Sequence, residues 1–388
     1  MEFELTEEQK RFQKLAHEYF EKELAPIVVE LEKKDNFPLD FFKKIGRDGF
    51  LGINLPKKYG GREADTITCC LLMEEVSHIC PGVAVCIFTT TMVSPLSILA
   101  VGSEEQKEKY LRPLARGERI LTLCFTEPDA GSDNLNIRTT AEKSGDYYII
   151  NGNKIFITNG TVGDIHLIVA YTDRSKGGRG LSMFLVDGHP PEIDISRKLD
   201  KLGWHTSDTV ELAINNLKVH KEQMLGPEGI GLSRTLDTIS FGRIMMAASA
   251  LGIAQGTYDE CVKFCNERMV NGSPLTKAQS IRHQLVNMYI DIEMNRLMIY
   301  KTAWKRDKGL RHRKESSIVK YYAGTLARRI TMEAVQLLGE NAFTDHDSLV
   351  ARHFRDAPVY TLADGTSEIQ QEIISREMGF VDKKEIRL

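Results

Sequence analysis

Apolar residues recur every three or four positions through the first third of the chain. Phe12, Leu15 and Tyr19 are spaced in this way, which is the pattern of a helix with one buried face. The segment 6–9, Thr-Glu-Glu-Gln, precedes them with the spacing of a capping box, a signal for a helix start. We therefore predict an all-helical domain over residues 1–118. Further helices are expected from Pro38, over residues 67–79, over the largely apolar residues 83–99, and from a second capping box at Ser103 until Pro113 interrupts it.

The pattern changes after residue 118. Short runs rich in β-branched and aromatic residues alternate with turn signals, without helical segments between them. Strands are expected at residues 121–125, 147–150, 154–158, 165–171, 181–186 and 210–214, with Asn151-Gly152-Asn153 as a hairpin turn between the second and third. This spacing predicts a small antiparallel barrel or sandwich for residues 119–230.

Long helices return after a Gly-rich segment, residues 226–231. No strand–helix–strand unit surrounds this segment, so it is interpreted as a linker and not as a phosphate loop. Helical periodicity then covers residues 236–268, 278–308 and 316–338. Residues 231–388 are expected to form a four-helix bundle that shares some helix faces with another subunit. The predicted fold class is α+β, with an N-terminal helical domain, a central β-barrel or sandwich and a C-terminal helical bundle.

Charge and cysteine content narrow the function classes. The chain has 388 residues with 51 basic and 54 acidic side chains, so no positive field favours nucleic acid or an anionic membrane as a partner. Seven cysteines are scattered without CxxC pairs, which favours a reducing compartment and predicts no metal site. The N-terminus lacks the features of a signal or transit peptide, and no run of about 18 apolar residues is present. We expect a bacterial cytoplasmic protein without a membrane span.

A helix pattern that ends at Pro358 leads into the first candidate for chemistry. Residues 359–362 are β-prone, and Gly365 then permits a tight turn before a helix capped by Thr366 or its neighbour. Asp364 is thereby held on a turn at a helix entrance. Taken alone, such an aspartate is most often a solvated surface residue.

The residues around Asp364 change that interpretation. F-R-D-A at residues 354–357, followed by D-G-T-S-E-I-Q at residues 364–370, resembles the C-terminal signature of the acyl-CoA dehydrogenase family. In that family the position of Asp364 is usually glutamate, and it is the base that removes a proton next to a thioester carbonyl. The resemblance implies that Asp364 is the base and that its backbone N–H and a flavin hydroxyl polarise the thioester. It also implies the acyl-CoA dehydrogenase fold.

Two segments of the predicted β domain resemble the family's flavin-binding motifs. Residues 123–133, L-C-F-T-E-P-D-A-G-S-D, are similar to T-E-P-x-A-G-S-D. This implies that Thr126 hydrogen-bonds the flavin ring and that Ser132 lies beside the pyrophosphate and the pantetheine arm of the substrate. The segment I-F-I-T-N-G implies that Thr158 contacts the flavin beside its hydride-accepting nitrogen. Phe156 stands where the family commonly has tryptophan, so a ring is retained while an N–H donor is lost.

Further matches lie in the C-terminal helices. Arg268 falls in a segment that resembles E-R-x-x-F-G-x-P…F-Q, which implies that its guanidinium reaches the FAD pyrophosphate of a neighbouring subunit. Residues 336–342 resemble Q-x-x-G-G-x-G, another FAD contact, with Glu340 and Ala342 in place of two glycines. Arg243 matches an arginine near the substrate and near the base loop, the turn at residues 364–366 that carries Asp364.

The resemblance thus implies a complete set of site residues, with no metal ligand among them. The expected cofactor contacts are Leu123, Phe125, Thr126, Ser132, Phe156, Thr158, Arg268, Gln279, Gln336, Gly339, Thr366 and Glu368. The expected substrate contacts are Ser132, Arg243 and Gly365.

The implied reaction is the FAD-dependent oxidation of an acyl-CoA to an enoyl-CoA by a homotetramer, with electron-transferring flavoprotein as the acceptor. Aspartate in place of glutamate withdraws the carboxylate by about 1.5 Å, and a displacement of about 1 Å costs roughly a hundredfold in rate. Some relatives carry a glutamate just before the arginine matched by Arg243, but here that residue is Gly242. We therefore expect a short, branched or alicyclic substrate, such as cyclohexane-1-carboxyl-CoA, whose α-carbon lies closer to Asp364.

Three alternatives are kept open. An enoyl-CoA reductase would use the same parts in the reverse direction. A flavin oxidase resembling nitroalkane oxidases would use aspartate at this position, but those enzymes have an arginine where this chain has Gln371. A non-catalytic FAD or acyl-CoA binding protein is the third.

Overall fold

The N-terminal helices begin where the capping motifs predict. The computed structural model describes residues 4–381. The Thr6 hydroxyl accepts a hydrogen bond from Gln9 N at 3.2 Å, which caps α1 (Glu7–Glu23), and Ser103 caps α7 (Glu104–Ala115) in the same way. The predicted interruption at Pro113 is wrong, because the missing N–H weakens only the last turn and α7 continues to Ala115. The other helices before residue 80 are α2 (Val28–Lys34), α3 (Leu39–Arg47) and α4 (Thr66–Ile79).

Residues 81–101 form the buried helical segment that the apolar run predicts. It consists of α5 (Pro81–Ile87), a π-helical turn at Phe88–Val93 and α6 (Pro95–Val101). This segment and α8 (Gly231–Glu267) are long and apolar enough to cross a membrane by length and composition. However, 83% and 78% of their most apolar windows are buried inside the protein, as in core helices. A π turn inside a helix is frequently found at functional sites, and every residue of this one is buried.

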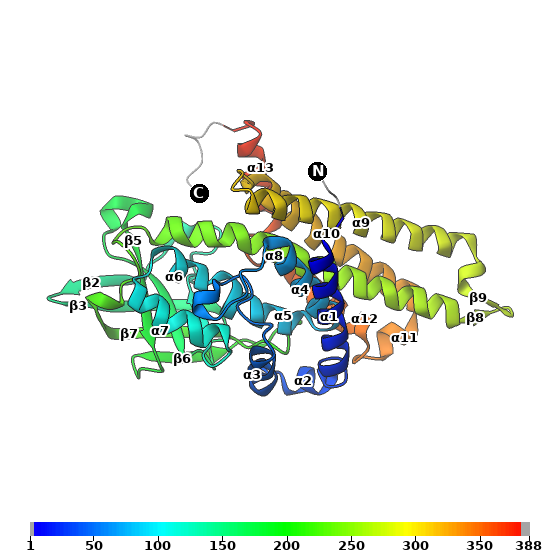
Figure 1. The fold of residues 1–388 in the computed structure, drawn as a ribbon, viewed down its shortest axis with the longest axis horizontal. Coiled ribbons are helices and arrows are strands. Elements are labelled where there is room, and N and C mark those ends of the chain that lie inside the picture. The colour runs from blue at the N-terminus through cyan, green and yellow to red at the C-terminus, as the bar shows by residue number, and fades with distance from the viewer. Residues whose placement is uncertain (1–3, 382–388) are drawn as a thin grey trace.

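The central strands form one mixed sheet at one end of the molecule (Figure 1). Its order is β1-β4-β2-β3-β7-β6, with β5 paired to β4. The expectation of purely antiparallel pairing is wrong, because β1 runs parallel to β4. Every residue of β4 is buried, which is usual for a central strand covered on both faces. The strands are β1 (Leu121–Cys124), β2 (Thr140–Ser144), β3 (Tyr147–Thr158), β4 (Ile165–Tyr171), β5 (Leu181–Asp187), β6 (Ile193–Lys198) and β7 (Thr209–His220).

The Asn-Gly signal at residues 151–152 marks a bulge and not the predicted hairpin turn. Strand β3 continues through it, and its register against β7 shifts between Ile150 and Gly152. A side chain at Gly152 would meet Thr139, since a Cβ there would lie 2.3 Å from the Thr139 hydroxyl oxygen. The turn lies earlier, at Gly145, which has a φ of +62° and links β2 to β3.

The C-terminal helices pack around α8, which runs from the sheet to the short hairpin of β8 (Met269–Val270) and β9 (Ser273–Pro274) at the other end (Figure 1). Small residues of α8 allow a close approach to α4. A Cβ on Gly252 would lie 2.3 Å from the carbonyl oxygen of Glu74. The other helices are α9 (Gln279–Asp307), α10 (Arg313–Leu338), α11 (Glu340–Thr344), α12 (Leu349–Asp356) and α13 (Ser367–Glu377).

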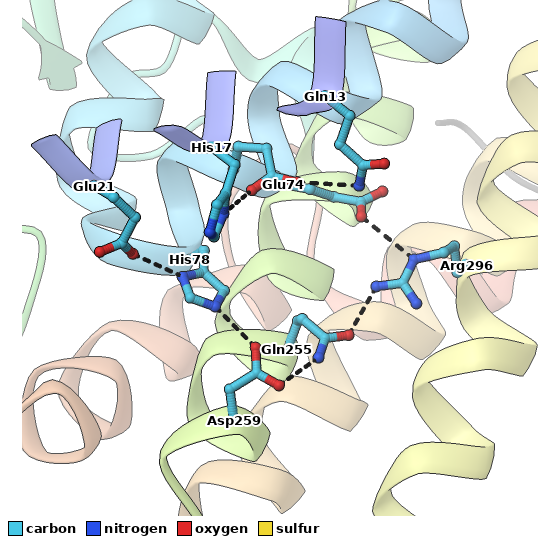
Figure 2. A network of polar contacts seen from close by, with 9 residues as sticks. Gln13, His17, Glu21, Glu74, His78, Gln255, Asp259 and Arg296 are labelled. Atoms are coloured by element: carbon cyan, nitrogen blue, oxygen red, sulfur yellow. Dashed lines mark hydrogen bonds and ion pairs between the residues drawn. The ribbon is translucent and has the colours of Figure 1, made fainter. Parts of the chain in front are cut away.

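A polar network joins the first helix to the C-terminal helices (Figure 2). His17 Nδ1 of α1 lies 2.9 Å from Glu75 Oε2 of α4, and His78 Nε2 of α4 lies 3.0 Å from Asp259 Oδ2 of α8. Arg296 of α9 continues the network by donating to the Gln255 side chain of α8 at 2.9 Å. Partly exposed pairs of this kind contribute little individually. Together they connect four helices drawn from both helical domains.

Candidate active site

The segment before Asp364 is helical and not the β-prone run that its composition predicts. α12 ends at Asp356, and a 3-10 turn follows over Ala357–Thr361. The turn directs Tyr360 into the core, where it is 1% exposed. There the Tyr360 hydroxyl lies 2.5 Å from Ser249 Oγ and its ring packs edge-on against Trp204. Tertiary packing of one aromatic ring therefore overrides the strand propensity of this segment.

Asp364 lies on a tight turn, as expected, but its own backbone is also unusual. Asp364 has a φ of +53° and Gly365 a φ of +92°, so two consecutive residues are left-handed. The Thr366 hydroxyl then accepts from Ile369 N at 3.4 Å and caps α13, which confirms the predicted helix start. A non-glycine residue in the left-handed region costs on the order of 1 kcal/mol or more and is typical of functional sites.

Two side chains that are not among the expected site residues hold this turn. Lys320 Nζ of α10 donates to the carbonyl of Gly365 at 2.5 Å. Gln370 Nε2 of α13 donates to the carbonyls of Asp364 and Gly365 at 3.2 and 2.8 Å. The backbone of the turn is thus fixed from two helices.

The carboxylate of Asp364 has positively charged neighbours but makes no ion pair within 4.0 Å among residues 4–381. Its Oδ2 atom is buried and has no hydrogen-bond partner among residues 4–381, and the same holds for Nε of Arg243. Burial raises the pKa of Asp364, while the charges of Lys320 and Arg243 act in the opposite direction. Burial lowers the pKa of Arg243 to about 10, against the effect of Asp364. The expected proximity of Arg243 to the base loop is therefore present.

Gly242 and Phe88 form the wall beside the carboxylate. A Cβ on Gly242 would lie 3.3 Å from Asp364 Oδ2 and 3.3 Å from the Phe88 ring. Phe88 begins the π-helical turn, so the first buried helical segment, α8 and the base loop meet at this point. Residue 242 faces the carboxylate directly, and here it contributes no side chain.

The loop after β1 is joined to the second half of β3. Thr126 O accepts a hydrogen bond from Ile155 N at 2.9 Å, which brings together two motifs separated in the sequence. Glu127 and Ala130 exchange backbone hydrogen bonds across Pro128, and this closes the turn. Leu123 and Phe125 flank it in and after β1, and Ser132 lies exposed beyond it.

A buried ion pair behind this loop was missed by the sequence analysis. Lys154 and Glu127 are 0% and 4% exposed, and their Nζ and Oε1 atoms are 2.8 Å apart. Lys154 also donates to the carbonyls of Phe125 and Val169 at 3.1 and 2.8 Å. The pair has no local sequence signal, because its partners are 27 residues apart.

The end of β3 leads from this loop toward Asp364. Phe156 has a φ of +59° and is 63% exposed, although it lies beside buried Ile157. Next to Thr158, the Asn159 side chain donates to the Thr90 hydroxyl at 2.9 Å. Thr90 belongs to the same π-helical turn as Phe88. The loop after β1 that carries Thr126 is therefore connected to the base loop through the second half of β3 and the π-helical turn.

The other expected cofactor contacts lie elsewhere. Arg268 follows α8 and Gln279 begins α9, at the hairpin end of the molecule, while the sheet lies at the opposite end (Figure 1). Gln336 and Gly339, at the end of α10, are exposed near α11 at the hairpin end. One chain therefore does not bring these residues to Thr126 or Asp364. Glu368 is exposed in the first turn of α13.

Comparisons with known proteins match the whole arrangement. Three family models cover the chain in succession: the N-terminal domain of acyl-CoA dehydrogenase over residues 6–118, its middle domain over residues 122–217 and its C-terminal domain over residues 229–379.

Relatives align over almost the full length. The short-chain specific acyl-CoA dehydrogenase of Clostridium acetobutylicum is 39% identical over 375 residues, 97% of this chain and 99% of that protein. The 3-(aryl)acrylate reductase of Clostridium sporogenes is 38% identical over 373 residues, 96% and 99% of the two chains. A subunit of the caffeyl-CoA reductase–Etf complex of Acetobacterium woodii is 35% identical over 371 residues, 95% and 98% of the two.

Solved structures agree on the fold. Butyryl-CoA dehydrogenase from Megasphaera elsdenii superposes with a TM-score of 0.94 at 38% identity, covering 97% of this chain and 100% of that one. A chain in a structure of the electron transferring flavoprotein of Acidaminococcus fermentans superposes with a TM-score of 0.95 at 36% identity, covering 97% and 99%. The predicted helical, β and helical organisation is confirmed. The chain belongs to the acyl-CoA dehydrogenase family, and like its members it is an FAD-dependent oxidoreductase that acts on CH–CH bonds.

Proposed function

We propose that this enzyme oxidises a short, branched or alicyclic acyl-CoA, such as cyclohexane-1-carboxyl-CoA, to its α,β-enoyl-CoA with Asp364 as the base. The observation that carries the proposal is the buried Oδ2 atom of Asp364, which lacks a hydrogen-bond partner within residues 4–381. A buried carboxylate oxygen without a hydrogen bond is costly unless a ligand or a proton completes it. Burial also raises the pKa of Asp364, which makes its carboxylate a stronger base.

The residues leading to Asp364 fit a bound FAD. The Phe156 ring is 63% exposed on a strand that is otherwise half buried, and a planar isoalloxazine would cover it. Thr126, in the loop after β1, and Thr158, at the end of β3, would hold the ring through their hydroxyl groups. When bound, FAD accepts the β-hydrogen of the substrate as hydride.

We assign polarisation of the thioester carbonyl to the backbone N–H of Asp364. An α-carbon is too weak an acid unless donors stabilise the oxygen that gains charge. The N–H of Asp364 makes no backbone hydrogen bond within residues 4–381, so it is free to donate to the thioester oxygen. The same residue then supplies both the donor and the base.

The length of the Asp364 side chain restricts the acyl group. Aspartate reaches about 1.5 Å less far than glutamate, so the α-carbon must come closer to the backbone. Gly242 contributes no side chain beside the carboxylate, and the Phe88 ring borders the same space. A branched or alicyclic acyl group is proposed because it can bring its α-carbon this close to the backbone, whereas a straight chain is positioned less well.

We also propose that the enzyme is a homotetramer in which a neighbouring subunit supplies Arg268, Gln279, Gln336 and Gly339. These residues lie at the far end from Thr126 in one chain (Figure 1). A second observation supports a subunit contact, namely that α9 exposes apolar side chains along one face: Val286, Tyr289, Ile290, Met294 and Leu297. Such an unpaired apolar face usually marks an interface. Light scattering of the holoenzyme should give four times the 43.8 kDa chain mass, and a monomeric mass would contradict this assembly.

The relatives support a choice of electron acceptor and of reaction direction, and the cysteines support a choice of cellular compartment. The complex of Acetobacterium woodii contains Etf, which supports electron-transferring flavoprotein as the partner here. Two relatives are named reductases, and this favours enoyl-CoA reduction as the second candidate function. All seven cysteines, which lie within residues 4–381, are free thiols, so a reducing compartment such as the bacterial cytoplasm is the proposed location.

Anaerobic titration with acyl-CoAs tests the proposal. Cyclohexane-1-carboxyl-CoA should bleach the flavin faster than butyryl-CoA does, by roughly tenfold or more, because misplacement of the α-carbon by about 1 Å is costly. Faster bleaching by butyryl-CoA would reject the alicyclic assignment. Reoxidation of the reduced enzyme by an arylacrylyl-CoA, without bleaching by any saturated acyl-CoA, would favour the reductase. Oxygen consumption with nitroethane alone would favour the oxidase, and a purified protein without flavin colour would favour a non-catalytic role.

A further inference from the structure

We infer that Lys320 is a positioning residue for the base: its ammonium group holds the turn that carries Asp364 and keeps a positive charge beside the carboxylate. This inference rests on the proposed role of Asp364. It extends the site to the part of α10 around Lys320, which no sequence motif had connected with the chemistry.

The environment of Lys320 is unusual for a lysine. Its side chain is 2% exposed, and lysine is almost never fully buried unless it is paired. Within residues 4–381 its hydrogen-bond acceptor is the carbonyl oxygen of Gly365, at 2.5 Å. A buried ammonium aimed at the residue after the base has a more specific task than packing, since an apolar side chain would fill the same space at lower cost.

The hydrogen bond opposes relaxation of a strained turn. Asp364 has a left-handed φ of +53°, a conformation that persists only where its surroundings impose it. Gly365 O accepts from Lys320 Nζ and also from Gln370 Nε2 at 2.8 Å. Gln370 also donates to the carbonyl of Asp364 at 3.2 Å. Lys320 and Gln370 therefore share the positioning, but only Lys320 brings a charge.

The charge acts directly on the carboxylate. Burial raises the pKa of Asp364, and the positive charges of Lys320 and Arg243 lower it. Burial lowers the pKa of Lys320 to about 8, with Asp364 acting to raise it. The other charged groups that face this cluster are Glu368 of α13, which acts on Lys320, and Arg313, which acts on Arg243. Lys320 therefore helps to keep the base ionised at neutral pH.

The test measures the rate of flavin reduction by the preferred acyl-CoA as a function of pH in the holoenzyme. Lys320→Met removes the charge and the donor. Because the lost charge had lowered the pKa of Asp364, the acid limb of the profile should move to higher pH by about one unit. The maximal rate should also fall by roughly tenfold, because the turn is less well fixed. Gln370→Leu removes hydrogen bonds without removing a charge, so it should lower the rate and leave the acid limb in place.

Two further variants separate positioning from general stability. Lys320→Arg keeps the charge and should retain the wild-type acid limb, whereas Lys320→Gln should shift it. Lys305→Met is the matched control, because Lys305 is a partly buried lysine of α9 that pairs with Glu315 at 2.6 Å and not with the base loop. It should change neither rate nor profile. If Lys320→Met fails to yield holoenzyme, the Arg and Gln variants decide the question alone.

The outcomes distinguish this inference from the proposal on which it rests. An unshifted acid limb in Lys320→Met or Lys320→Gln, with Asp364→Asn inactive, would overturn the role of Lys320 and leave the base assignment intact. Undiminished reduction in Asp364→Asn would overturn the base assignment itself, and the inference with it.

Discussion

Asp364→Asn is expected to slow flavin reduction by the preferred acyl-CoA by roughly a thousandfold, within the range observed for loss of a general base. Asparagine matches aspartate in shape but cannot take up the α-proton. The variant should still fold and retain FAD, because the turn is held through main-chain carbonyls by Lys320 and Gln370. Stopped-flow measurement of flavin bleaching under anaerobic conditions gives the rate, and the visible spectrum gives the flavin content. Bleaching at the wild-type rate would show that another group is the base.

Asp364→Glu tests the explanation for the short side chain. The carboxylate would extend by about 1.5 Å in a crowded region, since a Cβ on Gly242 would already lie 3.3 Å from both Asp364 Oδ2 and the Phe88 ring. Preference should then move from cyclohexane-1-carboxyl-CoA toward butyryl-CoA in the same bleaching assay. A variant that retains the original preference would mean that the length of the base does not select the substrate.

Glu127→Gln is expected to lower the free energy of unfolding by about 3–5 kcal/mol, because it leaves the Lys154 ammonium buried without its counter-charge. The lysine is 0% exposed and its ion pair is 2.8 Å long, so water cannot replace the lost carboxylate. Urea unfolding followed by circular dichroism measures the change. The same variant should lose FAD more readily, since Glu127 also accepts from the backbone N–H groups of Arg138 and Thr139 that shape the flavin-side loop.

Matched controls isolate the buried charge as the cause. The double variant Glu127→Gln/Lys154→Met removes both charges and should recover most of the lost stability. Asp146→Asn removes the partner of Lys221 in an ion pair between the β2–β3 turn and the residues after β7, whose side chains are 65% and 54% exposed. It should cost less than about 1 kcal/mol. Equal effects of Glu127→Gln and Asp146→Asn would contradict the argument.

Features encoded within a few residues were predictable. The caps at Thr6, Ser103 and Thr366 act over three residues and were placed correctly. Helical periodicity, which also repeats within a few residues, located α8, α9 and α10. Strands were harder, because β6 at the sheet edge is exposed at most positions and lacks an apolar signal.

The site residues likewise divide into those that local motifs identify and those that only long-range contacts bring together. Motifs quoted from consecutive residues pointed to Thr126, Phe156 and Asp364, and the fold joins these segments through short contacts. Neither the parallel pairing of β1 with β4 nor the Glu127–Lys154 pair was visible in the chain. The same is true of the bond from Lys320 to Gly365, which spans 45 residues. These contacts depend on which buried groups meet after the chain has folded. The residues next to a charged group or a carbonyl in the sequence do not indicate its distant partner.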